Sequence, residues 1–594
     1  MRHMIRPLST LVVALTTFAA FAAPSEKSTL TPVAELSWDQ IVAQDAFVDS
    51  SARKPEATPY MPGPAPHVAA QSFILPGDQP PMPQPVLRGI CPISALEPSL
   101  STNFQGLGDN NTRIPPDTMG AVGPNHVMTM INTQVRIHNR SGGTISTVNL
   151  STFWASVSTT AFDPRLLYDA QSGRWISCCA TNSRAASSSV GLAVSNTSDP
   201  TGTWRFYNID ADSSNVNWID YPTLGVNRNW IAVTGNMFTV AADAFSGAKM
   251  WVIDKTAAGA GTLTVTTFPV AFDTAGGTNG FTLQPCVTLD PLQNTLYLVD
   301  NSGDNDPVDG VQLIRISQIT GPVGAPVWSV VPGSAVPGTG QFRVPTDFVY
   351  GLLDAPQLGD ARLIETNDPR VQGNAIFRNG HIWFAHPGGA PITGNNRTNA
   401  YWYEVNPAAM PTPVVQQGII DGGAGVHHSF PSLGVNCNGD VCIGFSRADA
   451  TRFIEAAYAV HLSIDPPGFT RPVRVLKAGL SSYFKQFSGT RNRWGDYSAT
   501  MVDPNDDLSF WILQEYAEQR VGPTDNDSRW GVWWGKLAPS CSGDLNGDRT
   551  VDSADLGILL AAWMTTSAGD LNGDGLTNEA DLGIILGNWL VVCP

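Results

Sequence analysis

Two acidic segments near the C-terminus carry the residue types and the spacing that a hard cation needs. They span 543–563 and 569–589, and the second repeats the first at a constant offset. In each, oxygen-bearing side chains stand at positions one, three, five, nine and twelve of a loop, with a backbone carbonyl at position seven. Ca²⁺ prefers such alternating oxygens. We therefore predict two calcium ions, held by Asp544, Asn546, Asp548, Thr550, Asp552 and Asp555, and by Asp570, Asn572, Asp574, Leu576, Asn578 and Asp581.

A short helix is predicted after each loop. Apolar residues recur at i, i+3, i+4 and i+7, which places them on one helical face. Two such helices could bury these faces against each other, which explains why the loop-helix unit is duplicated. A solvated acidic linker is the alternative, but it would not repeat the ligands and the apolar stripe together. The stripes are Leu556, Leu559, Leu560 and Trp563, then Leu582, Ile585, Leu586 and Trp589.

The paired "DLNGD…D..D" loop-helix units resemble a type I dockerin, and the resemblance covers 541–594. It implies a small all-α, calcium-dependent module that joins a secreted protein to a cohesin-like or other extracellular or cell-surface partner. Positions ten and eleven usually carry a Ser/Thr pair for cohesin recognition. Here they hold Ser553-Ala554 and Glu579-Ala580. The calcium ligands therefore follow the pattern, whereas the recognition residues depart from it.

A second set of carboxylates lies in the long region before this tail. If its sheets converge, two carboxylates could act as acid and base in glycoside hydrolysis. Arg165 and Arg370, in the repeated "DPR", could then bind a sugar carboxylate in a bidentate way. In the alternative, each Asp accepts backbone N–H groups at a turn and each Arg pairs with a neighbour. The candidates for catalysis are Asp163, Asp220, Asp368 and Asp496.

These acidic residues head a loose repeat that predicts the fold. Its seven copies begin at 117, 163, 220, 284, 368, 429 and 496, at uneven intervals. Each interval accommodates a four-stranded antiparallel sheet, and radial arrangement is the common way for such repeated sheets to hide their edges. We predict a mainly β fold, with a propeller of about seven blades over 108–539. Six or eight blades, or a pair of β-sandwiches, are the alternatives.

Two further stretches resemble known propellers. "SNTSDPTGTW", which ends at Trp204, is similar to the Asp-box turn of sialidase-like propellers, with its Gly one place late. "PPDTMGAVGPNHV" and "RWGDYSATMVDPNDDLSFW" resemble secreted bacterial propellers without an established reaction. Such boxes are structural turns, so the resemblance implies a fold and no activity. The sequence leaves two functions open: a glycan-binding or assembly protein, and a glycoside hydrolase acting on polysaccharide.

The N-terminus predicts export. Residues 1–22 combine Arg2 and Arg6 with an apolar run over 11–21 and a small-residue cleavage site after Ala22, which is typical of a secretory signal peptide. A membrane anchor is the alternative, but the run is too short to span a bilayer. We expect a protein without a transmembrane segment, outside the cell or at its surface. Residues 23–107 are rich in proline and predict a spacer with one short helix over 34–47.

Charge and cysteine content complete the expectations. A formal net charge of -17 disfavours nucleic acid and anionic membranes as partners. Eight cysteines fit an oxidising compartment. Cys437 and Cys442 bracket a hairpin turn and could pair, and Cys541 and Cys593 could clasp the tail, whereas Cys91, Cys178, Cys179 and Cys286 stay unassigned. The acidic loop with Asp300, Asp304, Asp306 and Asp309 predicts either a third Ca²⁺ site or a solvated turn.

Overall fold

The structure is a computed structural model, and it describes residues 26–47, 55–57, 97–270, 281–301, 311–331, 343–345, 354–390, 396–410, 413–487, 489–540, 543–546, 548, 550–565, 568–571 and 575–591. The predicted signal peptide, most of the spacer, and Asp304, Asp306, Asp309, Cys91, Cys541 and Cys593 lie outside these residues. No helix within the described ranges is long and apolar enough to cross a membrane.

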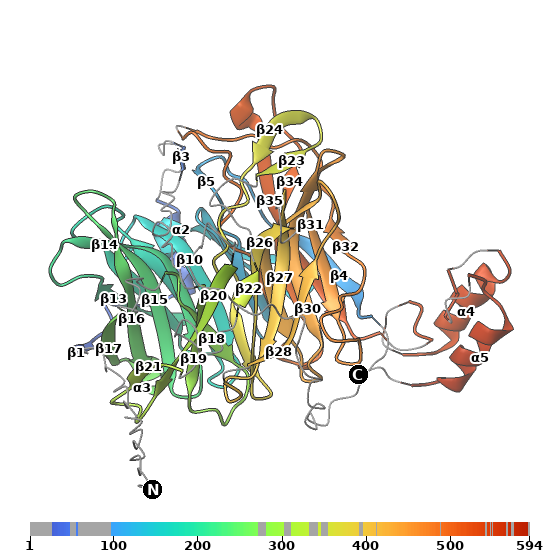
Figure 1. Cartoon of the computed structure of the whole chain (residues 1–594), viewed down its shortest axis with the longest axis horizontal. Helices are drawn as coiled ribbons and strands as arrows, with labels where there is room; N and C mark the ends of the chain where they lie inside the picture. The colour runs from blue at the N-terminus through green and yellow to red at the C-terminus, as the bar shows by residue number, and fades with distance from the viewer. Residues whose placement is uncertain are drawn as a thin grey trace, which may run out of the picture.

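The chain is mainly β, as predicted, and it runs through successive antiparallel meanders (Figure 1). The first contains β6 (Met119–Val122), β7 (His126–Met130), β8 (Gln134–Asn139) and β9 (Thr144–Asn149). The second contains β10 (Ala161–Asp169), β11 (Arg174–Thr181), β12 (Ser189–Ser195) and β13 (Thr203–Asp210). The third contains β14 (Asn217–Val226), β15 (Trp230–Thr239), β16 (Phe245–Asp254) and β17 (Leu263–Val270).

Four more meanders follow. The fourth contains β18 (Gln284–Thr288), β19 (Leu296–Asn301), β20 (Val311–Thr320) and β21 (Val327–Val330), with β22 (Arg343–Pro345) also on β20. The fifth contains β25 (Ala375–Arg378), β26 (His381–Ala390), β27 (Arg397–Val405) and β28 (Val414–Ile420). The sixth contains β29 (His427–Val435), β30 (Val441–Asp449), β31 (Arg452–His461) and β32 (Arg474–Lys477). The last contains β33 (Ala499–Val502), β34 (Phe510–Glu518), β35 (Arg529–Ala538) and β4 (Ser99–Gly108).

Smaller elements decorate these meanders. β1 (Glu26–Leu30) extends the third meander, and β2 (Ala34–Ser37) extends the second. The remaining elements are α1 (Trp38–Asp45), β3 (Glu56–Ala57), β5 (Arg113–Ile114), α2 (Leu150–Phe153), α3 (Lys255–Ala260), β23 (Ala355–Gln357), β24 (Asp360–Ile364), the short helix η3 (Asp525–Asp527), α4 (Ser553–Ala562) and α5 (Glu579–Gly587). The helix predicted over 34–47 is therefore present as α1. In Figure 1, α4 and α5 lie at one side of the β region.

The first strands of neighbouring meanders approach one another closely. β14, β18 and β25 pair in parallel and join three meanders into one sheet. A Cβ atom on Gly225 of β14 would lie 2.6 Å from the Pro285 backbone of β18, and one on Gly434 of β29 would lie 3.1 Å from the Met501 backbone of β33. Glycine is needed at such contacts because any side chain would separate the strands. The first strands of these meanders are thereby brought close together.

The last meander joins the two ends of the β region, and it corrects one expected boundary. Alternate residues of β35, Trp530, Val532 and Trp534, are fully buried. β4, however, pairs with β35 along its whole length, from Gly108 opposite Gly531 to Ser99 opposite Ala538. The predicted spacer therefore ends before residue 99. Composition missed this strand because its partner lies at the far end of the β region in sequence.

The predicted Cys437–Cys442 disulfide is wrong. Asn438 and Gly439 do form the tight turn between β29 and β30. Cys442 is opposite Gly434 in the register of this hairpin and is a free, buried thiol, whereas Cys437 lies in the turn itself. Cys437 is disulfide-bonded to another residue. Disulfides need cysteines that face each other, and the hairpin register does not provide that pair.

Candidate functional site

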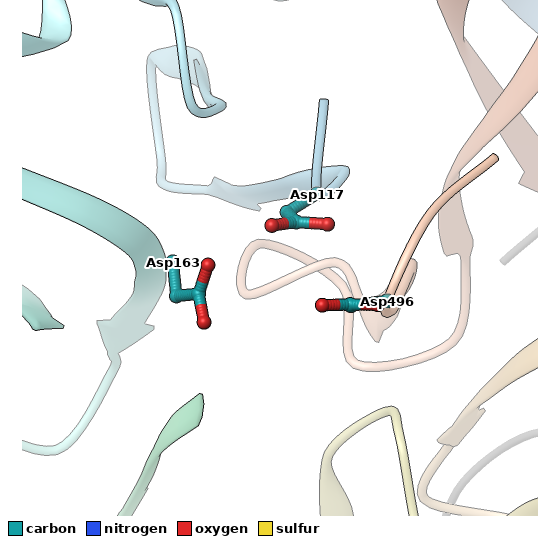
Figure 2. Close-up of side chains that lie close together, drawn as sticks. All are labelled: Asp117, Asp163 and Asp496. Carbon is teal, nitrogen blue, oxygen red and sulfur yellow. The ribbon is translucent and has the colours of Figure 1, made fainter. Parts of the chain in front are cut away.

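Three aspartates from distant parts of the chain converge at the centre of the β region (Figure 2). Asp117 precedes β6, Asp163 belongs to β10, and Asp496 precedes β33. One carboxylate oxygen from each lies within 4.8 Å of the other two. The side chains are buried, with exposed fractions of 0%, 2% and 5%. Figure 2 shows the three carboxylates facing a common point from three separate segments.

A recurring backbone feature directs these side chains inward. Asp163 has φ 51° and lies at a β-bulge in the pairing of β10 with β11. Equivalent bulges occur at Tyr221 in β14, with φ 51°, and at Phe430 in β29, with φ 53°, and each of these residues precedes a proline. Asp117 has φ 52°. A bulge re-aims the neighbouring side chain, and at Asp163 it accompanies a carboxylate that faces the other two.

Two asparagines organise the cluster. Asn132 Nδ2 donates to Asp117 Oδ2 at 2.6 Å, and Asn132 Oδ1 accepts from the backbone N–H of Asp163 at 2.8 Å. Asn367 Nδ2 donates to Asp496 Oδ1 at 2.8 Å. Within the described residues, Asp117 Oδ1 and Asn367 Oδ1 are buried without a hydrogen-bond partner. Among the described residues, these two oxygen atoms of the centre therefore have no donor.

Burial dominates the protonation of these groups. It raises the pKa of Asp163 to about 6, together with repulsion from Asp496. Burial and repulsion from Asp496 and Asp163 hold the pKa of Asp117 well above its usual range. The same three causes, burial first, raise the pKa of Asp220. Asp220 therefore interacts with the cluster, and its Oδ1 is another buried oxygen without a hydrogen-bond partner in the described part of the chain.

The two arginines of the repeated "DPR" have structural partners. Arg165 Nε donates to Pro222 O at 2.9 Å, and its Nη1 donates to Gln372 O at 3.0 Å. Its guanidinium carbon lies 3.5 Å from the centroid of the Tyr497 ring. Arg370 is ion-paired with Asp368. Both arginines are buried, which favours the pairing hypothesis over the binding of a sugar carboxylate.

The four catalytic candidates predicted from the sequence thus occupy different environments. Asp163 and Asp496 meet, Asp220 lies close enough to repel them, and Asp368 is held by Arg370. Asp117 was not among the candidates, although it heads the first repeat. Only its position at the start of a repeat could have indicated it. Retaining glycosidases hold their two carboxylates about 5–5.5 Å apart, but they present them to a cleft. Carboxylates this deeply buried do not present themselves to a sugar ring.

The C-terminal loops form a second candidate site with matching internal geometry. Asp555 Oδ1 accepts from Leu545 N and Asp581 Oδ1 accepts from Leu571 N, both at 2.7 Å. Asp555 Oδ2 accepts from Asp552 N and Asp581 Oδ2 accepts from Asn578 N, both at 2.8 Å. The contacts with Asp552 N and Asn578 N are parts of capping boxes at the starts of α4 and α5. The residue at position twelve therefore closes both loops in the same way.

The loop residues present suit a calcium ion chemically. Asp555 and Asp581 are fully buried, and each carboxylate oxygen has lone pairs for both a backbone N–H and a cation. Gly575, at position six of the second loop, has φ 91°, the sharp turn that the calcium loop requires. Asn572 and Asp574 lie outside the described residues. The donors in the described part of both loops are all oxygens, the ligand type that Ca²⁺ takes.

The two C-terminal helices pack as predicted only in part. Val551, Leu559 and Ile585 form a small buried core, against which Leu556, Trp563 and Leu582 pack. Leu560 and Leu586 were expected on the same face but are 55% and 57% exposed. Leu560 follows buried Leu559 directly and Leu586 follows buried Ile585, so each exposed residue points about 100° away from the buried one around its helix. Apolar side chains therefore remain on the surface of this pair.

Asp300 and the motif that ends at Trp204 have structural roles. Asp300, offered as part of a third calcium site, is buried in β19, and its Oδ1 accepts from Arg315 Nε at 3.2 Å. The other three aspartates of the predicted third calcium site lie outside the described residues, so that site stays a prediction. The motif that ends at Trp204 is a turn between β12 and β13: Asp199 Oδ1 accepts from Thr201 N at 2.9 Å, and Trp204 Nε1 donates to Pro200 O. The turn interpretation of this motif is confirmed.

Comparison with known proteins does not identify a family. No protein-family model matches the chain, and no curated protein matches it. Among solved structures, the α-L-arabinofuranosidase Arb93A from Fusarium graminearum is 11% identical, with a TM-score of 0.36 over 63% of this chain and 92% of that one. The Bacillus subtilis arabinanase Arb43A is 16% identical, with a TM-score of 0.27 over 51% and 97%. A Trypanosoma rangeli sialidase mutant is 11% identical, with a TM-score of 0.33 over 68% and 57%. Similarity at this level assigns neither a family nor an activity.

Proposed function

We propose that this chain is a secreted modular protein in which a C-terminal, calcium-binding docking module attaches a seven-bladed β-propeller to an extracellular or cell-surface partner. The observation that carries the proposal is the repeated geometry of the two C-terminal loops, where Asp555 and Asp581 make the same contacts at equivalent positions. A solvated acidic linker would have no reason to repeat them. One Ca²⁺ ion in each loop would hold that loop to its helix, because the carboxylates of the loop otherwise repel one another.

The propeller part of the proposal is supported by strand topology. Seven antiparallel meanders follow one another, their first strands approach a common centre, and β4 joins the chain start to β35. Such pairing of the two ends removes the open edge of a ring of sheets. A pair of β-sandwiches would not bring the first strand of every meander to one point.

The surface of the C-terminal module supports docking. Exposed apolar side chains come in pairs at the offset of the sequence repeat: Leu560 with Leu586, and Met564 with Leu590, with exposed fractions between 55% and 67%. Trp589 and Val591 add to them. Paired exposed apolar residues on so small a unit fit a protein partner that binds across its internal repeat. A cohesin-like module is the partner that the dockerin resemblance implies.

Glycan binding by the propeller is the remaining part of the proposal, and it rests on that resemblance, since dockerins accompany proteins that act on polysaccharides. A glycoside hydrolase is the second candidate. The observation in its favour is the raised pKa of Asp163 beside Asp496, a pattern shared with acid and base pairs. The burial of both carboxylates favours the noncatalytic function.

The docking proposal is tested by calcium-dependent binding of the full-length protein. Isothermal titration calorimetry of the full chain should give two more bound Ca²⁺ ions than the variant Asp544→Ala/Asp570→Ala. The same variant should lose calcium-dependent binding to an immobilised cohesin module, whereas Asp39→Ala, on the exposed side of α1, should retain it. Equal calcium stoichiometry in the two proteins would reject the module. A polysaccharide panel scored for binding and for new reducing ends separates the two propeller functions.

A further inference from the structure

The central aspartates form a site of their own, distinct from the C-terminal loops. We propose that Asp117, Asp163 and Asp496 bind one Ca²⁺ ion at the centre of the β region. Nothing in the C-terminal module contributes to this site. The proposal does not depend on the docking function, and it is tested separately.

The geometry of the three oxygens suits Ca²⁺. They lie within 4.8 Å of one another, and oxygens on opposite sides of a calcium ion are about 5 Å apart, since Ca–O distances are about 2.3–2.6 Å. Mg²⁺ holds its ligands at about 2.0–2.1 Å and demands near-ideal octahedral geometry. The group also consists of oxygens alone, which disfavours zinc and the softer metals.

Unsatisfied oxygens point to a ligand that the protein does not supply. Asp117 Oδ1, Asp220 Oδ1 and Asn367 Oδ1 have no hydrogen-bond partner within the described residues, although each residue is at most 4% exposed. Asn367 is held at the cluster because its Nδ2 donates to Asp496. Leaving such an acceptor buried without a partner costs free energy, and a cation bound by the three carboxylates removes that cost for Asp117.

Neighbouring cations leave negative charge at the centre. Arg370 is ion-paired with Asp368, and Arg165 donates to two backbone carbonyls. Arg493 donates to Asp496 at 2.5 Å and lies 3.9 Å from Glu365. Arg493 therefore balances the charge of Asp496, whereas Asp117 and Asp163 have no ion-pair partner within the described residues. A divalent cation balances the excess.

Such an ion would act as a cross-link. Asp117 and Asp496 stand near opposite ends of the β region in sequence, and Asp163 lies in a third segment. One ion would therefore tie the first, second and last meanders together. The pairing of β4 with β35 joins the two ends of the β region through strands, and the metal would join them through side chains at the centre. Without a metal, the carboxylates of Asp117 and Asp163 can lie this close together only if they share a proton.

The two occupants, calcium and a shared proton, are separated by an isosteric substitution. The background is the full chain with Asp544→Ala/Asp570→Ala, which removes calcium binding by the tail loops. After treatment with EDTA, thermal unfolding of this protein is followed by tryptophan fluorescence with and without Ca²⁺. We expect Ca²⁺ to raise its Tm by at least about 2 °C, and Asp117→Asn or Asp163→Asn to abolish the rise.

A matched control and a direct probe complete the test. Asp503, buried and paired with Lys536 at 2.9 Å, serves as the control: Asp503→Asn should lower Tm but keep the calcium-dependent rise. If Asp117→Asn does not fold, Tb³⁺ luminescence of the background protein decides, because buried Tyr221 and Tyr497 can sensitise one bound ion that Ca²⁺ displaces. No Tb³⁺ emission, no calcium-dependent Tm, or an Asp117→Asn variant of unchanged calcium response would overturn the proposal in favour of a shared proton.

Discussion

Replacement of Arg165 by methionine should destabilise the β region strongly. The guanidinium joins four segments: it projects from β10, donates to Pro222 of β14 and to Gln372 before β25, and lies against Tyr497. Methionine fills much of the same volume without any donor. The two carbonyl oxygens would then be buried without these charged partners.

The expected magnitude follows from these contacts. Each hydrogen bond from a charged donor contributes about 1.5–3 kcal/mol, and the desolvated contact with the Tyr497 ring contributes about 2 kcal/mol. Methionine offsets part of this loss of free energy, because burying its side chain does not require the desolvation of a charge. We expect Arg165→Met to lower the free energy of unfolding by about 3–5 kcal/mol.

Urea unfolding at pH 7, followed by tryptophan fluorescence, measures the change. The control is Arg184→Met, because Arg184 is 43% exposed and pairs with Asp243 at the surface; we expect a loss below about 1 kcal/mol. An Arg165→Met protein as stable as the wild type would refute the structural role. Loss of binding to a sialylated glycan at unchanged stability would instead restore Arg165 as a ligand for a sugar carboxylate.

Three further perturbations test the packing and the pH response. Leu107→Ala, at a fully buried position of β4, should cost about 2–5 kcal/mol in urea unfolding, and a loss below about 1 kcal/mol would contradict the role of β4 in the last meander. Gly225→Ala should destabilise by about 1–3 kcal/mol because its Cβ meets the Pro285 backbone, whereas Gly557→Ala in α4, with nothing within 4 Å, should not destabilise. Burial lowers the pKa of His386 and His428 to about 4, below the value near 6.5 in the unfolded chain, so only the unfolded state takes up their protons as pH falls between these values. The contribution of these two neutral histidines to the free energy of unfolding is therefore complete above about pH 6.5 and is lost as pH falls toward 4. Each histidine should lower the free energy of unfolding by about 2 kcal/mol between pH 7 and pH 5. His386→Phe should reduce this difference between the two pH values by about 2 kcal/mol, and an unchanged difference would contradict this account.

Local patterns in the sequence predicted local structure well. The capping residues Asp552 and Asn578 begin helices where the apolar periodicity starts, because N-caps and side-chain spacing act over a few residues. The apolar stripes after the two loops likewise include Leu559 and Ile585, which are fully buried. Repeat starts at 163 and 429 coincide with bulges at the entry of inner strands, since the same short motif produces the same turn.

Contacts between distant segments could not be predicted in the same way. Nothing near 99–108 indicates that β35 is its partner, because strand pairing depends on both strands and on the ring between them. Asp368 resembles Asp163 in its "DPR" context, yet it pairs with its own Arg370 while Asp163 faces the centre. Identical motifs diverge here because neighbouring meanders supply different partners.

The measurement that tests the central claim most directly is hydrogen–deuterium exchange of the full chain in Ca²⁺ and in EGTA. The account predicts that chelation abolishes protection of the amides of α4 and α5 and of Leu545 and Leu571, whose N–H groups bond to Asp555 and Asp581. The outer strands of the β region, such as β13 and β28, should remain protected. Protection of α4 and α5 that is identical in Ca²⁺ and in EGTA would contradict a calcium-dependent docking module.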